Sequence, residues 1–135
     1  MKPWIGRVGV LLGGLAVAGA TNVATMGAAS ADDDGGCGGP GFAHVCVSED
    51  GGAINYTGYT NYATGNCTIH MMLWDYTEKP GGVKVFTSDF PCANGSHDYR
   101  PHGLSNPASG HDYKAEMRVD WGERVDTYLS PDLFA

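Results

Sequence analysis

The residues best suited to chemistry lie in one segment, SHDYRPHGLSNPASGHDY, between Ser96 and Tyr113. It contains three of the five histidines, His97, His102 and His111. Imidazole groups bind zinc and act as general acids or bases near neutral pH. The segment could therefore hold a metal ion or the active site of a small hydrolase or nuclease.

The composition and spacing of this segment favour a simpler interpretation. Four and eight residues separate the three histidines, which is not the spacing of a zinc motif. A histidine pair that acts on a phosphate needs cations to hold it, and nearby aspartates outnumber Arg100 and Lys114. Prolines and glycines predict a long loop. We expect solvated loop histidines with no metal and no cofactor, and a histidine-dependent secreted hydrolase or nuclease toxin is the alternative.

The first thirty-one residues have the pattern of a signal peptide. Lys2 and Arg7 precede or flank an uncharged apolar run over residues 8–20, and the segment ends in Ala-Ser-Ala at 29–31, a pattern that signal peptidases accept. The apolar run is shorter than the roughly 20 residues that span a bilayer. We expect residues 1–31 to be removed, and the protein to be secreted and free of the membrane afterwards.

The chain that remains is small and acidic. Cleavage leaves all fifteen aspartates and glutamates but only six of the eight lysines and arginines, so the mature net charge is −9. Binding to nucleic acid through a basic surface needs clustered cations that neutralise phosphates. We therefore expect no nucleic-acid partner.

All four cysteines, Cys37, Cys46, Cys67 and Cys92, follow the leader. An even number in a secreted chain predicts two disulfides, and three pairings are open. We favour Cys37–Cys46, which closes the loop CGGPGFAHVC, together with Cys67–Cys92, which would tie two strands across the core.

Residues 32–52 begin with DDDGGCGGPG, which contains five glycines, a proline and three aspartates. Such a segment buries too little apolar surface to offset the entropy of ordering it. We expect a flexible arm that includes the disulfide-closed loop and offers Phe42 and His44 to a partner. A proteinase-inhibitor-like module, which presents this loop to an active site, is a further alternative.

Residues 53–135 carry the patterns of short strands separated by turns. The clearest alternation runs from Tyr113 to Trp121, where Tyr, Ala, Met, Val and Trp alternate with Lys, Glu, Arg and Asp. In CTIHMMLWDYT both alternating faces are largely apolar, which predicts a central strand. These patterns predict an all-β domain, a small disulfide-stabilised antiparallel β-sandwich that is immunoglobulin-like in architecture.

One predicted strand carries three tyrosines at intervals of three residues, Tyr56, Tyr59 and Tyr62. They could bind carbohydrate or a protein partner, because aromatic rings stack on sugar faces and the asparagines between them can bond hydroxyls. Tyr56 and Tyr62 also share the parity of core positions, so the alternative is that both pack inside the domain.

The leader, the segment DDDGGCGGPG and the Cys67–Cys92 β domain give a layout that resembles the small secreted actinobacterial adapter proteins of umbrella toxin particles. The resemblance covers residues 32–135. In such particles a small adapter joins a lectin-bearing subunit to a large toxin-bearing one. The resemblance implies a secreted, non-catalytic binding or adapter module of an extracellular antibacterial assembly, with other secreted proteins as its partners.

Overall fold

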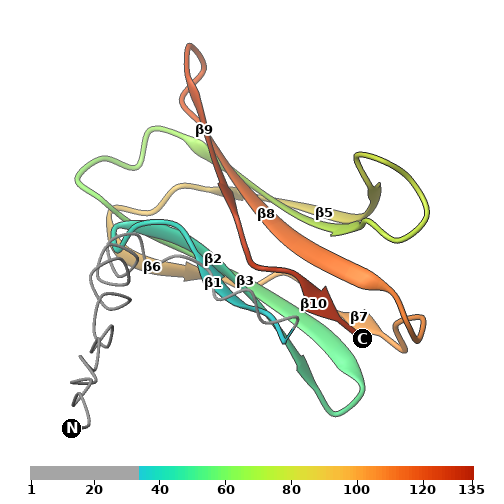
Figure 1. Ribbon diagram of the computed structural model, residues 1–135. Coiled ribbons are helices and arrows are strands. Elements are labelled where there is room, and N and C mark those ends of the chain that lie inside the picture. The colour runs from blue at the N-terminus through green and yellow to red at the C-terminus, as the bar shows by residue number, and fades with distance from the viewer. Residues whose placement is uncertain (1–33) are drawn as a thin grey trace, which may run out of the picture.

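The computed structural model describes residues 34–135, which form two antiparallel sheets stacked face to face (Figure 1). The predicted signal peptide, residues 1–31, lies outside the described residues. In the part that is described, no helix is long and apolar enough to cross a membrane. The predicted all-β fold, a small antiparallel sandwich with two disulfides, is confirmed.

The first sheet is built around β3. Its strands are β1 (Gly36–Gly38), β2 (Ala43–Asp50), β3 (Ala53–Tyr62), β6 (Gly95–Tyr99) and β7 (Leu104–Ser105). They lie in the order β1-β2-β3-β6, and β7 pairs with the beginning of β3 while β6 pairs with its end. β6 and β7 therefore continue one another along the side of β3 that β2 leaves open.

The second sheet is built around β4 and β8. Its strands are β4 (Thr68–Asp75), β5 (Val83–Pro91), β8 (Asp112–Asp120), β9 (Val125–Leu129) and β10 (Leu133–Phe134). They lie in the order β10-β8-β4-β5, and β9 pairs with the end of β8. β4 thus has a neighbour on each side, as its two apolar faces predict.

The connections follow an immunoglobulin-type path. β2, β3 and β6 stand in the order of strands A, B and E of such a sandwich, and β5, β4, β8 and β9 stand in the order C′, C, F and G. The backbone N–H of Ala108 donates to the hydroxyl of Tyr113, 3.1 Å away, at the start of β8. This contact corresponds to the tyrosine corner of immunoglobulin-like domains.

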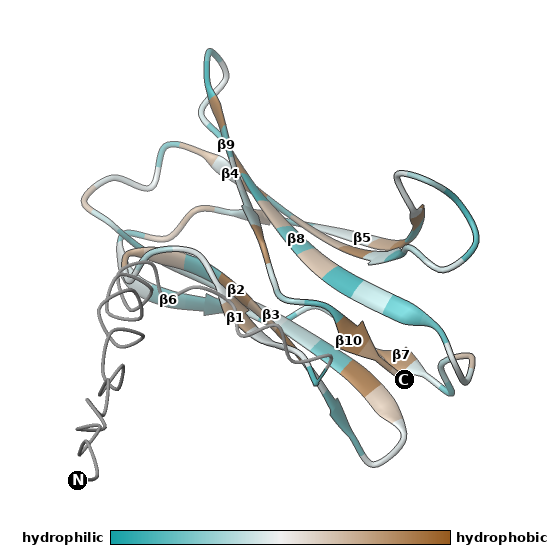
Figure 2. Ribbon diagram, in the orientation of Figure 1, coloured by the Kyte–Doolittle hydropathy of each residue, from teal (hydrophilic) through white to brown (hydrophobic). Residues whose placement is uncertain are grey.

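The core is made by side chains that alternate inward along the strands. Figure 2 shows that hydrophobic and hydrophilic residues alternate along β8. The predicted inward positions Tyr113, Ala115, Met117 and Val119 of β8 are buried, and Glu116, predicted to face solvent, is buried as well. At Gly58 on β3 the two sheets come very close, since an added Cβ would lie 2.7 Å from the sulfurs of Met71 and Met117. Any side chain at Gly58 would therefore force these methionines to move.

The segment predicted as a flexible arm, residues 32–52, is largely part of the first sheet. β2 lies within it, pairs with β3 along its whole length and buries Ala43, Val45 and Val47. The arm prediction is wrong for β2, because three alternating apolar side chains that reach the core offset the entropy cost of ordering this strand. The sandwich therefore begins before residue 53.

The glycines ahead of β2 let the chain pass close to the second sheet. The N–H of Gly35 donates to the carbonyl oxygen of Asp132, 3.0 Å away. A Cβ on Gly35 would overlap the carbonyl oxygen of Val47, and one on Gly38 would overlap that of Leu129. The glycine-rich segment therefore closes one edge of the sandwich instead of extending away from it.

The cysteines form the two predicted disulfides, Cys37–Cys46 and Cys67–Cys92. Cys67 precedes β4 and Cys92 follows β5, so their disulfide joins neighbouring strands at one end of the second sheet. The expectation that it ties strands across the core is wrong, because the β4–β5 hairpin brings both ends together within one sheet. The two disulfides indicate an oxidising, extracellular-type environment.

Candidate functional site

The three histidines considered for catalysis have separate surroundings. His97 lies on β6, which replaces part of the predicted loop, and its ring centroid is 4.8 Å from that of Tyr99. His102 is exposed between β6 and β7, whereas His111 binds Asp75 of the second sheet. Among residues 34–135 there is no group of three or more His, Cys, Asp and Glu side chains that could hold a metal ion.

The contact between His111 and Asp75 ties two strands together. Nδ1 of His111 lies 2.6 Å from Oδ2 of Asp75, and the N–H of Thr77 donates to Oδ1 of Asp75 at 2.9 Å. Partial burial alone would raise the pKa of Asp75, but the hydrogen bonds from His111 and Thr77 together outweigh it and lower that pKa below its usual value. Asp75 thereby links the end of β4 to the start of β8.

Two of the tyrosines considered as contact residues are internal. Tyr56 is 2% exposed and belongs to the core. Tyr62 is partly buried, and its ring centroid lies 5.1 Å from the ring of Trp121. The alternative, in which both pack inside, is therefore confirmed for Tyr56, whereas Tyr62 packs against the core and stays partly exposed. The three tyrosines do not share one outer face of the sheet.

Tyr59 and His44 lie together on the outer face of the first sheet. They are direct partners between β2 and β3, and their ring centroids are 4.8 Å apart. The hydroxyl of Tyr59 donates to Oγ of Ser96, and Phe42 is half exposed just before β2. Within the disulfide-closed loop only residues 39–42 lie outside strands, so the loop available to a proteinase is shorter than the sequence suggests.

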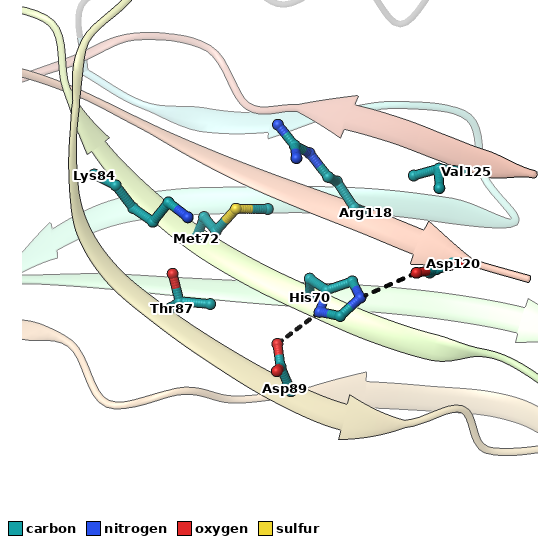
Figure 3. A pocket seen from close by; sticks show the side chains of 8 residues that line it. All are labelled: His70, Met72, Lys84, Thr87, Asp89, Arg118, Asp120 and Val125. Carbon is teal, nitrogen blue, oxygen red and sulfur yellow. Dashed lines mark hydrogen bonds and ion pairs between the residues drawn. The ribbon is translucent and has the colours of Figure 1, made fainter. Parts of the chain in front are cut away.

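The outer face of the second sheet carries a hollow that the sequence analysis did not single out (Figure 3). It has a volume of about 280 Å³. We call it the His70 hollow, and it is lined by His70, Met72, Lys84, Thr87, Asp89, Arg118, Asp120 and Val125. These side chains come from β4, β5, β8 and β9, and the sheet register places Asp89 and Arg118 on either side of His70.

His70 lies between two carboxylates at the centre of this hollow, as Figure 3 shows. Its Nδ1 is 2.7 Å from Oδ1 of Asp89, and its Nε2 is 3.5 Å from Oδ2 of Asp120. A general base needs a ring nitrogen within hydrogen-bond reach of the proton that it removes. The hydrogen bond to Asp89 fixes the orientation of the ring, and Nε2 faces Asp120.

The rest of the hollow combines cations with an apolar floor. Met72 is 2% exposed and lies at its base. Arg118 binds the buried carboxylate of Glu116 through Nε, and Nζ of Lys84 lies 5.6 Å from the centre of the Trp74 ring. Cationic, acidic and apolar groups therefore line one hollow.

Part of this site could have been found from the sequence. The alternation places His70 and Met72 outward on one strand, and Arg118 and Asp120 outward on another. The missing information was the pairing of β5 beside β4, which brings Asp89 to His70. Register between strands depends on turns and on the whole buried face, so a local pattern does not show it.

Comparisons with known proteins give no match. No family model fits the chain, no curated protein is similar to it, and no solved structure matches its fold. The geometry of the site is therefore the basis for a function.

Proposed function

We propose that this protein is a secreted, non-catalytic binding module that holds another secreted protein on the outer face of its second sheet. The observation that carries the proposal is the His70 hollow, in which Nδ1 of His70 is hydrogen-bonded to Asp89 at 2.7 Å and Oδ2 of Asp120 lies 3.5 Å from Nε2. An imidazole held against a carboxylate contributes a polar group of fixed orientation to a binding surface.

Several features favour a protein as the ligand. Arg118 and Lys84 add positive groups, and Val125 is 51% exposed at the rim. Leu129 is also exposed, on the same face of β9. Arginine and exposed apolar side chains are enriched where proteins bind one another.

An adapter needs two surfaces that bind different partners at the same time. His44 and Tyr59 lie on the outer face of the first sheet, whereas the His70 hollow lies on the outer face of the second. Two sheets stacked face to face turn these surfaces in opposite directions. This arrangement supports a role that joins two subunits of an extracellular antibacterial assembly, as in the umbrella-particle adapters that the chain resembles.

The test is recovery of partners from the culture medium of the producing cells. The oxidised protein, purified after expression of the full chain, is immobilised and the bound proteins are identified by mass spectrometry. A variant with Lys84→Glu and Val125→Glu changes the hollow at exposed positions, and Arg100→Glu changes an exposed cation just after β6 of the first sheet. We expect at least about a tenfold loss of the recovered partner with the first variant and none with the second.

Two outcomes would contradict the proposal. One is a binding result, either equal recovery of the partner by both variants or recovery of no defined partner by the unchanged protein. The other is a hydrolytic activity of the purified protein that disappears with His97→Ala, His102→Ala or His111→Ala, which would support the enzyme alternative.

A further inference from the structure

β5 is the longest strand at an edge of the described sheets. It spans Val83–Pro91, nine residues, and pairs with β4 alone. The other edge strands, β1, β6, β7, β9 and β10, have three, five, two, five and two residues. Short edge strands are one way in which proteins prevent unwanted pairing, and β5 does not use it.

The register shows which backbone groups of β5 face outward. The N–H of Cys92 donates to the carbonyl oxygen of Cys67, so these residues form a hydrogen-bonded pair beside Thr68 and Pro91. Such pairs alternate along an antiparallel ladder, and the residues between them turn their N–H and C=O groups away from the neighbouring strand. Thr87 and Asp89 therefore direct their backbone groups to the open edge.

The features that protect an edge stand at the two ends of β5 and leave its middle open. Lys84 lies near the start, and the register shift between Leu73 and Trp74 leaves Val85 without an opposite residue. Pro91 ends the strand, at a position where no ladder N–H is needed. The segment from Phe86 to Phe90 contains no lysine, bulge or proline, and Asp89 is its one charged residue.

The side chains of this open segment have two different faces. The side chain of Asp89 is 58% exposed on the outer face, at the His70 hollow. Phe86 lies opposite Leu73, on the inner face, and remains 39% exposed. A strand added at this edge would meet an acidic group on one face and an apolar ring on the other.

We propose that β5 binds an extended segment of a partner protein as an added antiparallel strand, with a basic residue opposite Asp89 and an apolar residue opposite Phe86. This mode of recognition rests on the proposed function, because the added strand would lie beside the His70 hollow. The outward backbone groups of Thr87 and Asp89 supply the hydrogen bonds, and the two side-chain positions supply the specificity.

The experiment uses the oxidised full protein and two synthetic eight-residue peptides of alternating threonine and valine. One carries arginine at the position that faces Asp89, and the other carries glutamate there. Amide hydrogen exchange should show slower exchange of the N–H groups of Thr87 and Asp89 with the arginine peptide. The glutamate peptide should bind at least about fivefold more weakly, because like charges then lie opposite one another.

A backbone variant tests strand addition directly. Thr87→Pro removes the Thr87 hydroxyl and an outward N–H without removing a hydrogen bond to β4. Thr87→Ala also removes the hydroxyl but keeps the N–H. We expect the arginine peptide to bind at least about tenfold more weakly to Thr87→Pro than to Thr87→Ala. Circular dichroism confirms that both variants are folded.

The results separate this inference from the proposed function. Equal binding by the two Thr87 variants, protection at other edges, or pairing of β5 with a second copy would overturn strand addition. If Thr87→Pro still recovers the secreted partner that is lost with Lys84→Glu and Val125→Glu, the proposed function stands and strand addition is wrong. If neither variant changes recovery, both are wrong.

Discussion

The two outer faces of this sandwich have the same strand architecture but different chemistry. The first sheet presents mostly neutral polar groups, His44, Thr57, Tyr59, Asn61 and Ser96, with Asp98 beside them. The second sheet presents ionisable side chains in contact, with His70 between Asp89 and Asp120 and with Arg118 on Glu116. Of the residues singled out in the sequence, His44 and Tyr59 lie on the first face, whereas the hollow lies on the second.

The difference arises from cross-strand neighbours. Every outward position on a strand can be polar, but a site forms only where residues from several strands complement one another. On the second sheet, His70 of β4 meets Asp89 of β5 and Asp120 of β8. On the first sheet, His44 of β2 meets the ring of Tyr59. Residues of similar type therefore serve different purposes on the two faces.

The largest expected effect is the loss of unfolding free energy when a disulfide is removed, and it should differ between the two sheets. Cys67–Cys92 spans 25 residues and Cys37–Cys46 spans 9. In the chain-entropy estimate, opening them costs about 3.5 and about 2.6 kcal/mol of unfolding free energy. Replacing Cys67 and Cys92 with alanine should therefore destabilise the protein more than replacing Cys37 and Cys46. Urea unfolding of both double variants measures the difference, and the reverse order would show that native-state contacts dominate.

The next prediction compares the stability lost when the arginine of one ion pair on each face is replaced by alanine. Arg118 binds Glu116, which is 5% exposed, so Arg118→Ala leaves a buried carboxylate without this partner. We expect a loss of about 2 kcal/mol in unfolding free energy. Arg100 and Asp98 are both largely exposed, with 3.6 Å between their charged atoms, and Arg100→Ala should cost less than about 0.5 kcal/mol.

Thermal and urea unfolding of both arginine variants give these values. A full recovery of stability in the double variant with Arg118→Ala and Glu116→Gln would confirm that the buried charge is the cause. Equal losses for Arg118→Ala and Arg100→Ala would remove the energetic distinction between the faces.

A third prediction asks whether the faces bind different partners. The double variant His44→Ala and Tyr59→Ala should bind one secreted partner at least about tenfold more weakly. The double variant Lys84→Glu and Val125→Glu should bind a different partner at least about tenfold more weakly. Surface plasmon resonance with each purified partner measures both effects. Loss of the same partner with both variants would mean a single binding surface, and the protein would then not be an adapter.

The smallest expected effect is the acid dependence of Asp75. Because the folded-state pKa of Asp75 is lowered, its stabilising contribution is present above the ordinary carboxyl pKa of about 4 and is lost as the pH falls through the lowered value. Asp75→Asn should cost about 1 kcal/mol at neutral pH and less in acid. Urea unfolding between pH 7 and pH 2 tests this, and a constant difference across that range would contradict it.

The sequence by itself determined the fold class and much of the core. The alternation from Tyr113 to Trp121 predicted the apolar buried positions of β8. The even number of cysteines predicted two disulfides, and the favoured pairing is the one that forms. These features are local or depend on few residues, so pattern and composition are sufficient to predict them.

Only the tertiary structure decided the role of the glycine-rich segment and the position of the candidate site. The glycines before β2 fit against Val47 and Leu129, which are distant in the sequence or in the other sheet. The His70 hollow exists because β5 and β8 flank β4 in a particular register. Both features depend on which strands become neighbours, and that choice is made by the packing of the whole core.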